Sequence, residues 1–190
     1  MGMEFVKIGD NPPEEINVII EVPKGGSSVK YEMDKDSGMI FVDRLIATPM
    51  YYPAHYGFIP HTLSDDGDPL DVLVVEDEDL IPGCVIPVRP VGVLIMEDES
   101  GIDEKILAVP TSSIDKKYKD VASYKDLPVT LINQIKHFFE HYKDLEEGKW
   151  VKVTGWEDID SAKKIIESSI KNAQEEKNKH RFFGTKIGID

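Results

Sequence analysis

The 190-residue sequence predicts an α+β fold that is mainly β, in which a barrel of short strands is combined with two main helices. Many short strand-like runs follow one another closely, and such spacing favours a barrel over an open parallel sheet. Only two segments change to the helical period, and both lie after most of the strands.

The strand candidates are rich in β-branched residues and are separated by glycine, proline and aspartate turns. They are residues 16–22, 29–33, 39–42, 72–75, 85–88, 91–96, 106–109 and 150–156. Between the second and third, residues 34–38 (Asp-Lys-Asp-Ser-Gly) have the composition of a hairpin loop. No internal repeat or linker interrupts the series, so a single domain is expected.

Two helices are expected in the second half of the chain. From Pro128 the apolar residues recur at the spacing i, i+1, i+4, i+7, i+8 and i+11, which is one face of a helix. A second helix is expected from about Ser161, with Ala162, Ile165 and Ile166 on its apolar face. The following stretch, 174–180, is almost wholly polar and is expected to fray or lie loose.

The composition limits the classes of partner. With 36 acidic and 22 basic residues, the formal net charge is −14, which argues against a nucleic acid or an anionic membrane as the main partner. No apolar run approaches the roughly 20 residues of a membrane span, and the N-terminal residues lack a signal-peptide pattern. A cytoplasmic location is therefore expected. The single cysteine, Cys84, excludes an internal disulfide and is interpreted as a small buried apolar residue.

The most informative stretch is 65–71, where Asp65, Asp66, Asp68 and Asp71 immediately precede an apolar strand. Carboxylates held so closely repel one another, and a bound divalent cation would remove that repulsion. An acidic turn that caps the strand is the structural alternative. A calcium loop of the EF-hand type is excluded, because the sixth and twelfth positions counted from Asp66 are not the required glycine and glutamate.

Other groups are ambiguous when taken alone. The acidic segment 97–105 is typical of a solvated hairpin loop, and the aromatic segment 50–58 is typical of packing. Lys30 and Arg44 would be surface residues as often as phosphate ligands. His137 and His141 lie one helical turn apart and could bind zinc.

Together these parts resemble a known family. The segment Asp66-Gly67-Asp68-Pro69-Leu70-Asp71 matches D-x-D-P-x-D, the signature of family I soluble inorganic pyrophosphatases. Further segments resemble that family in its order and spacing: Ile20-Glu21-Val22-Pro23, Lys30-Tyr31-Glu32, Asp43-Arg44, Tyr52-Pro53, Tyr56-Gly57, Arg89-Pro90-Val91-Gly92, Asp98, Asp103, Lys105 and His141-Tyr142-Lys143. The resemblance is to the bacterial form, covers about residues 5–170, and leaves a polar tail, 171–190, within one pyrophosphatase domain spanning 1–190.

The resemblance implies a small closed OB-like β-barrel flanked by two main helices. It implies a metal-binding set composed of acidic residues: Asp66, Asp71, Asp98, Asp103, Glu21 and Glu32. Asp66, Asp71 and Asp103 would hold the principal ion, with Asp71 shared by a second one. Asp98 and Asp103 would hold the ion that arrives with substrate, and the two glutamates would orient metal-bound waters.

The resemblance also implies the activity, which is hydrolysis of pyrophosphate to two orthophosphates with several Mg²⁺ ions per site and Mn²⁺ as a substitute. Asp68 would be the base that accepts a proton from the attacking water. The phosphoryl oxygens would be bound by Lys30, Arg44, Tyr56, Lys105, Tyr142 and Lys143. A homo-oligomer, a hexamer built from trimers, is implied, and the helix with His137 and His141 would lie at a subunit contact.

Two alternatives stay open at this point. The first is a metal-dependent phosphatase that acts on nucleotides or phosphate esters. The second is a non-enzymatic protein, either an OB-like binding module or an acidic calcium binder. An oligonucleotide-binding module should carry a basic groove with stacking aromatics, whereas this chain is strongly acidic.

Overall fold

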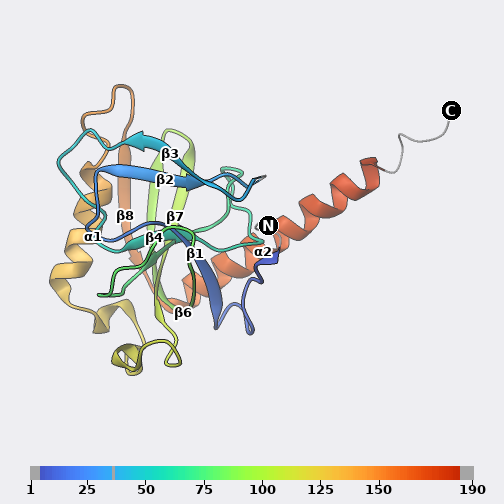
Figure 1. Ribbon diagram of the computed structural model, residues 1–190, viewed down its shortest axis with the longest axis horizontal. Coiled ribbons are helices and arrows are strands. Elements are labelled where there is room, and N and C mark those ends of the chain that lie inside the picture. Colours follow the sequence, from blue (N-terminus) through green and yellow to red (C-terminus); the bar gives the residue numbers. More distant parts are fainter. Residues whose placement is uncertain (1–4, 36, 185–190) are drawn as a thin grey trace.

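The computed structural model describes residues 5–35 and 37–184, with only the backbone described for 180–184. The fold is mainly β with two α-helices, as expected (Figure 1). The strands are β1 (Ile16–Val22), β2 (Val29–Met33), β3 (Ile40–Leu45), β4 (His55–Phe58), β5 (Asp71–Val74), β6 (Val85–Asp98), β7 (Gly101–Pro110) and β8 (Val151–Glu157). The helices are α1 (Val129–His141) and α2 (Ile159–Gly184), with short 3-10 turns at Lys116–Tyr118 and Tyr124–Asp126.

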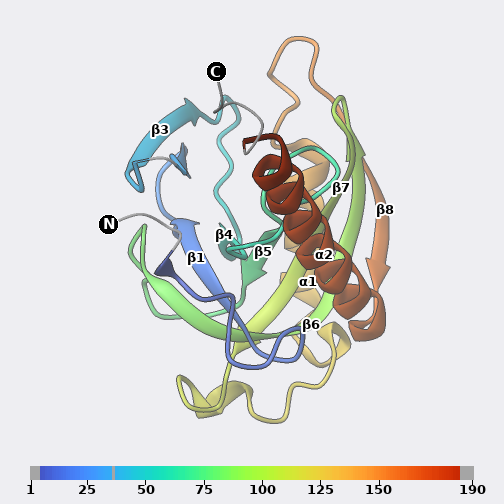
Figure 2. The same ribbon diagram turned by 90° about the vertical axis from the view of Figure 1, so that its right-hand side faces the viewer.

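Six strands form one sheet in the order β1-β4-β5-β7-β6-β8, and β1 also pairs with β6. The pairing therefore runs around a ring of five strands, with β8 attached to the outer side of β6 (Figure 2). All pairs in this sheet are antiparallel except β5 with β7. Strands β2 and β3 form a separate two-stranded hairpin.

The strand β6 combines two segments that the sequence presents as separate strands. Its first part pairs with β1, and its second part pairs with β7 and β8. The register with β7 shifts between Pro90 and Gly92, so Val91 is the extra residue of a β-bulge that bends the strand. Gly92 is required there, because a Cβ atom would lie 2.8 Å from the ring of Tyr124. One long bent strand thus pairs with β1 at its start and with β7 and β8 further along.

The alternation of side chains along the strands separates two apolar cores. Leu73 and Leu107 face one core, which is completed by Phe138 and Phe139 of α1. Val72 and its neighbours face the other core, which includes residues of α2. The two helices consequently lie on opposite sides of the strands (Figures 1 and 2).

Three local expectations need correction. Residues 55–58 were expected only to pack as part of an aromatic segment, but they form the strand β4. This strand shows no alternating polarity, because all four of its residues are buried. The acidic segment 97–105 is not a loop, since it forms the ends of β6 and β7 around a two-residue turn. The polar stretch 174–180 continues α2, which extends away from the sheet (Figure 1). Within the described ranges, neither α1 nor α2 has the length and apolar character needed to cross a bilayer.

Candidate active site

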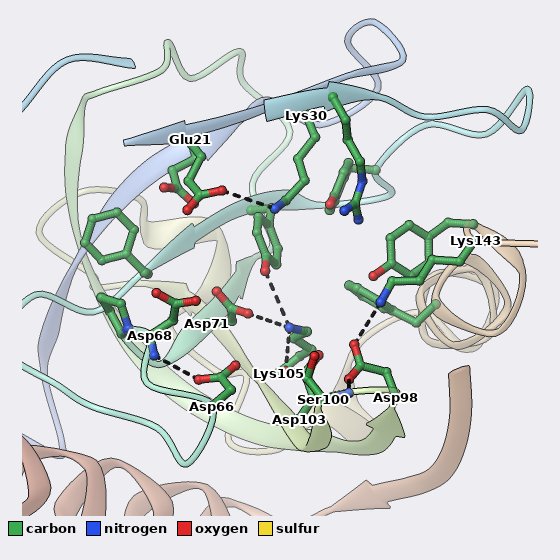
Figure 3. A pocket seen from close by; sticks show the side chains of 18 of the residues that line it. Glu21, Lys30, Asp66, Asp68, Asp71, Asp98, Ser100, Asp103, Lys105 and Lys143 are labelled. Carbon is green, nitrogen blue, oxygen red and sulfur yellow. Dashed lines mark hydrogen bonds and ion pairs between the residues drawn. The ribbon is translucent and has the colours of Figure 1, made fainter. Parts of the chain in front are cut away.

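A cavity of about 280 Å³ opens beside the β2–β3 hairpin, between the ends of β5, β6 and β7 and the end of α1 (Figure 3). The thirteen residues assigned to the site from the sequence all line it: Glu21, Lys30, Glu32, Arg44, Tyr56, Asp66, Asp68, Asp71, Asp98, Asp103, Lys105, Tyr142 and Lys143. They come from eight segments of the chain, namely β1, β2, β3, β4, the start of β5 with the loop before it, β6, β7 and the residues after α1.

The aspartate-rich loop before β5 is a tight turn as well as a cavity wall. Gly67 has φ of 91°, a left-handed conformation that glycine adopts without strain. One oxygen of Asp66 accepts a hydrogen bond from the backbone N–H of Asp68 at 3.0 Å. The turn chemistry expected of an acidic turn is therefore present, and it directs both carboxylates and Asp71 toward the cavity (Figure 3).

Lys105 lies at the centre of the acidic group. Lys105 of β7 is the register partner of Asp71 of β5. Asp103 lies two residues before Lys105, on the same face of β7. The Lys105 ammonium contacts the carboxylate of Asp71 and lies 2.6 Å from that of Asp103. Its side chain is only 5% exposed, and although burial opposes the charge, the two carboxylates hold the pKa of Lys105 well above its usual range. Burial in turn raises the pKa of Asp103.

Glu21 enters the cavity from a β-bulge in β1. Ile20 pairs with Gly57 and Val22 pairs with Tyr56, so Glu21 is the extra residue, and a bulge commonly redirects such a side chain. Its carboxyl group accepts a hydrogen bond from the backbone N–H of Met33 at 2.8 Å. Burial is the main cause that raises the pKa of Glu21 to about 8.

The hairpin of β2 and β3 carries two cations on adjacent strands. Lys30 and Arg44 are register partners, and the Lys30 ammonium lies 2.9 Å from Asp43 and 3.6 Å from Glu32. The Arg44 guanidinium lies 3.6 Å from Glu146, a residue that follows α1. These ion pairs hold both cations at the rim of the cavity.

The chain leaving α1 supplies the opposite wall. Tyr142 is buried, and its ring packs on that of Phe138 with centroids 5.1 Å apart. The next residue, Lys143, places its ammonium 2.8 Å from Asp98, at the end of β6. Figure 3 shows Lys143 reaching toward Asp98, which lies beside Asp103 and close to Lys105.

Comparison with known proteins agrees with this arrangement. The family described as inorganic pyrophosphatase matches residues 18–174. A protein of Agrobacterium fabrum named inorganic pyrophosphatase is 61% identical over 170 residues, which cover 90% of this chain and 96% of that protein. The chain belongs to the inorganic pyrophosphatase family. It is an enzyme of this family in its bacterial form.

Solved structures of the family share the fold. An inorganic pyrophosphatase from Coxiella burnetii is 50% identical, with a TM-score of 0.85 over 88% of this chain and 99% of that one. The enzyme of Thermus thermophilus is 44% identical, with a TM-score of 0.86 over 92% of this chain and 99% of that one. The mainly-β fold with two helices is therefore the fold of pyrophosphatases.

The cavity also contains polar residues to which the sequence analysis gave no role: Lys35, Tyr52, Glu99, Ser100 and Lys149. Lys35 lies 2.5 Å from Asp68, and Lys149 lies 2.5 Å from Glu99. Tyr52 was visible as part of a pyrophosphatase segment, but its position in the wall was not. The two lysines lie in loops, so no periodicity in the sequence indicates where their side chains point. Cys84 packs beside the α2-side core, away from this cavity.

Proposed function

We propose that this pyrophosphatase hydrolyses inorganic pyrophosphate to two orthophosphates by attack of a water molecule, in a reaction that depends on Mg²⁺. The observation that supports this most directly is the convergence of carboxylates and cations in one small cavity. Phosphoryl transfer needs neutralisation of charge and in-line positioning more than covalent help, and this arrangement suits both needs.

The donor set fits a hard divalent cation. The carboxylates of Asp66, Asp71, Asp98 and Asp103 offer only oxygen, as Mg²⁺ and Mn²⁺ prefer. The ammonium of Lys105 already lies between two of them, which indicates that this group requires positive charge. When bound, the cations would neutralise phosphoryl oxygens and make water more acidic. Glu21 and Glu32 would hold waters beside them.

The cationic and phenolic side chains would bind the substrate. Arg44 offers a planar fork to phosphoryl oxygens, whereas Lys30 and Lys143 act as point charges on two walls of the cavity. Tyr56 and Tyr142 are buried, and burial raises the pKa of each phenol, so both would donate hydrogen bonds as neutral groups. Lys105 would add charge from the floor of the cavity.

Asp68 would accept the proton of the attacking water. It is the most exposed of the aspartates that take part in the ion pairs of the cavity, with 63% of its side chain accessible, so water reaches it directly. We expect Asp68→Asn to keep the fold and to lower kcat by about 100- to 10,000-fold, the usual contribution of a general base. Asp65→Asn, a neighbouring aspartate outside the cavity lining, is the control. Full activity of Asp68→Asn would remove this residue from the role of base.

A phosphate-release assay separates the substrate classes. With Mg²⁺, we expect rapid release from pyrophosphate and slow release from a nucleoside triphosphate or a simple monoester. Comparable rates on all three would favour the broader phosphatase. If wild-type protein releases no phosphate from pyrophosphate with Mg²⁺, a binding module or calcium binder would replace the enzymatic proposal.

We further propose that the five-strand ring is a closed OB-like barrel, that the protein is a cytoplasmic homo-oligomer, and that the oligomer is a hexamer. The continuous pairing from β1 back to β6 supports the barrel. Light scattering tests the assembly, and a monomer at micromolar concentration would contradict it. No nucleic acid or membrane is needed as a partner.

A further inference from the structure

Arg44 and Glu146 face each other where two walls of the cavity meet. Arg44 belongs to β3 and lines the cavity, whereas Glu146 follows α1 and is not among the lining residues. Arg44 Nε lies 3.6 Å from Oε1 of Glu146. Only 16% of the Glu146 side chain is exposed, so its contact with the arginine lies beneath the surface.

The two facing atoms depend on each other. Arg44 Nε and Glu146 Oε1 are both shielded from solvent, and neither has a hydrogen-bond partner within residues 5–35 and 37–184. A buried polar atom without a partner is unfavourable, and shortening this contact by roughly half an ångström would make it a charge-assisted hydrogen bond. Burial opposes the charge of Arg44, and Glu146 is the strongest of the influences that nevertheless raise the pKa of Arg44.

The shape of the guanidinium gives this contact a direction. Its N–H donors form a rigid planar fork, so fixing Nε also fixes where the two terminal nitrogens point. Glu146 occupies the Nε side, which leaves the terminal edge for a ligand. Nη1 lies 3.9 Å from Asp43, a longer contact than the 2.9 Å between Asp43 and Lys30. The end of the guanidinium is thus the part of Arg44 that can meet a phosphoryl group.

Glu146 is itself held between two lysines of the cavity. Its backbone N–H donates to the carbonyl of Lys143 at 2.9 Å, and its own carbonyl accepts from the N–H of Lys149 at 3.2 Å. The hydroxyl of Thr48, a buried residue shortly after β3, donates to the carbonyl of Tyr142 at 3.4 Å. The segment after α1 is therefore attached to the β3 side of the cavity by this hydrogen bond as well as by the Glu146 ion pair.

We propose that Glu146 is a positioning residue for pyrophosphate hydrolysis, because it fixes the Nε side of Arg44 and so aims the terminal fork at the phosphoryl oxygens. A long arginine side chain has many rotamers, and a ligand that meets it unrestrained must order it on binding. Glu146 orders this side chain before the substrate arrives. The inference rests on the proposed reaction and on the phosphoryl-binding role of Arg44, and it adds the group that orients this arginine.

The test compares the rates of Glu146→Ala, Glu146→Gln and Glu147→Ala on pyrophosphate with Mg²⁺. Glu147 is the next residue, is exposed, and provides the matched control. We expect Glu146→Ala to keep the fold and to lower kcat/KM by about 10- to 100-fold, since a misplacement of about 1 Å can cost as much as the upper value. Glu146→Gln keeps an oxygen for Arg44 Nε and should recover most of this loss. Glu147→Ala should behave as wild type does.

A double-mutant cycle with Arg44→Gln shows whether Glu146 acts through the arginine. In the Arg44→Gln background, Glu146→Ala should have little further effect on kcat/KM. An effect as large as in the wild-type background would overturn the proposal, and so would equal kcat/KM values in Glu146→Ala and Glu147→Ala. A lower Tm with unchanged kcat/KM would also overturn it, because Glu146 would then only stabilise the fold.

The rate at which phenylglyoxal modifies Arg44, followed by peptide mass mapping, is a readout that needs no turnover. The reagent attacks the neutral guanidine, so loss of the Glu146 carboxylate should speed this modification. Arg89, whose guanidinium donates to the carbonyls of Tyr118 and Val121, is the internal reference and should react equally in wild type and variant. An unchanged rate at Arg44 would overturn the inference. If the rate rises but wild-type protein does not hydrolyse pyrophosphate, the orientation of Arg44 is right and the proposed reaction is wrong.

Discussion

Replacing Lys105 with methionine removes the ammonium that joins Asp71 to Asp103 and keeps a side chain of similar volume. The lysine is buried, so the variant leaves two carboxylates facing each other without a counter-charge. Removing one partner of a buried ion pair typically costs about 3–5 kcal/mol. For a chain of this size, 1 kcal/mol corresponds to about 2–4 °C in Tm, so we expect Lys105→Met to lower Tm by roughly 6–20 °C.

The assay is thermal unfolding at one protein concentration, first in a chelator and then with increasing Mg²⁺. If the carboxylates hold Mg²⁺, the cation should replace the missing ammonium, and Mg²⁺ should raise Tm more in the variant than in the wild type. Lys152→Met, which changes an exposed lysine of β8, is the control and should alter stability by less than about 0.5 kcal/mol. A loss in Lys105→Met no larger than in this control would refute the reasoning, and an equal response to Mg²⁺ would refute the shared metal site.

Three further predictions concern pH, packing and the cavity rim. Because burial raises the pKa of Glu21 from 4.5 to about 8, the folded protein keeps a proton that the unfolded chain releases. In a chelator, the free energy of unfolding of the protein in urea should therefore fall as the pH rises from 4.5 to about 8. Glu21→Gln should remove this pH dependence, and a pH dependence that persists in the variant would point to other groups. Gly57→Ala would place a Cβ atom 2.0 Å from the carbonyl oxygen of Ile19, so we expect a loss of about 3 kcal/mol or more in urea unfolding. An unchanged urea midpoint would mean that β1 and β4 can separate freely. Lys35→Gln removes an exposed ion pair with Asp68, so it should change the free energy of unfolding by less than about 1 kcal/mol and raise the KM for pyrophosphate. A lower Tm with an unchanged KM would mean that Lys35 has a structural role only.

The sequence predicts the strands best where one strand face differs from the other or where turn residues frame the strand. β1 and β2 begin and end at the expected residues. β4 was missed because its four residues are all buried, and an aromatic run without alternation does not distinguish a strand from general packing. The bend of β6 was missed because Pro90 and Gly92 indicate a break, whereas the structure uses them in a bulge.

The candidate site was found through resemblance and not through spacing. Asp66, Asp68 and Asp71 are close in sequence, and the turn around Gly67 keeps them close in space. Arg44 and Lys143 are almost a hundred residues apart, and no local pattern shows that they share a cavity. Long-range pairing brings them together, and such pairing leaves little trace in a single sequence.

The parallel pairing of β5 with β7 limits how this site can change. Asp71 meets Lys105 because they are register partners, and side chains of a strand alternate between its two faces. Insertion of a single residue in either strand would exchange Lys105 for Glu104 or Ile106 at this position. The backbone positions of the charged residues can therefore shift only in steps of two residues, roughly 7 Å along the strand. Finer adjustment of the distance between the charges depends on side-chain length, as between aspartate and glutamate.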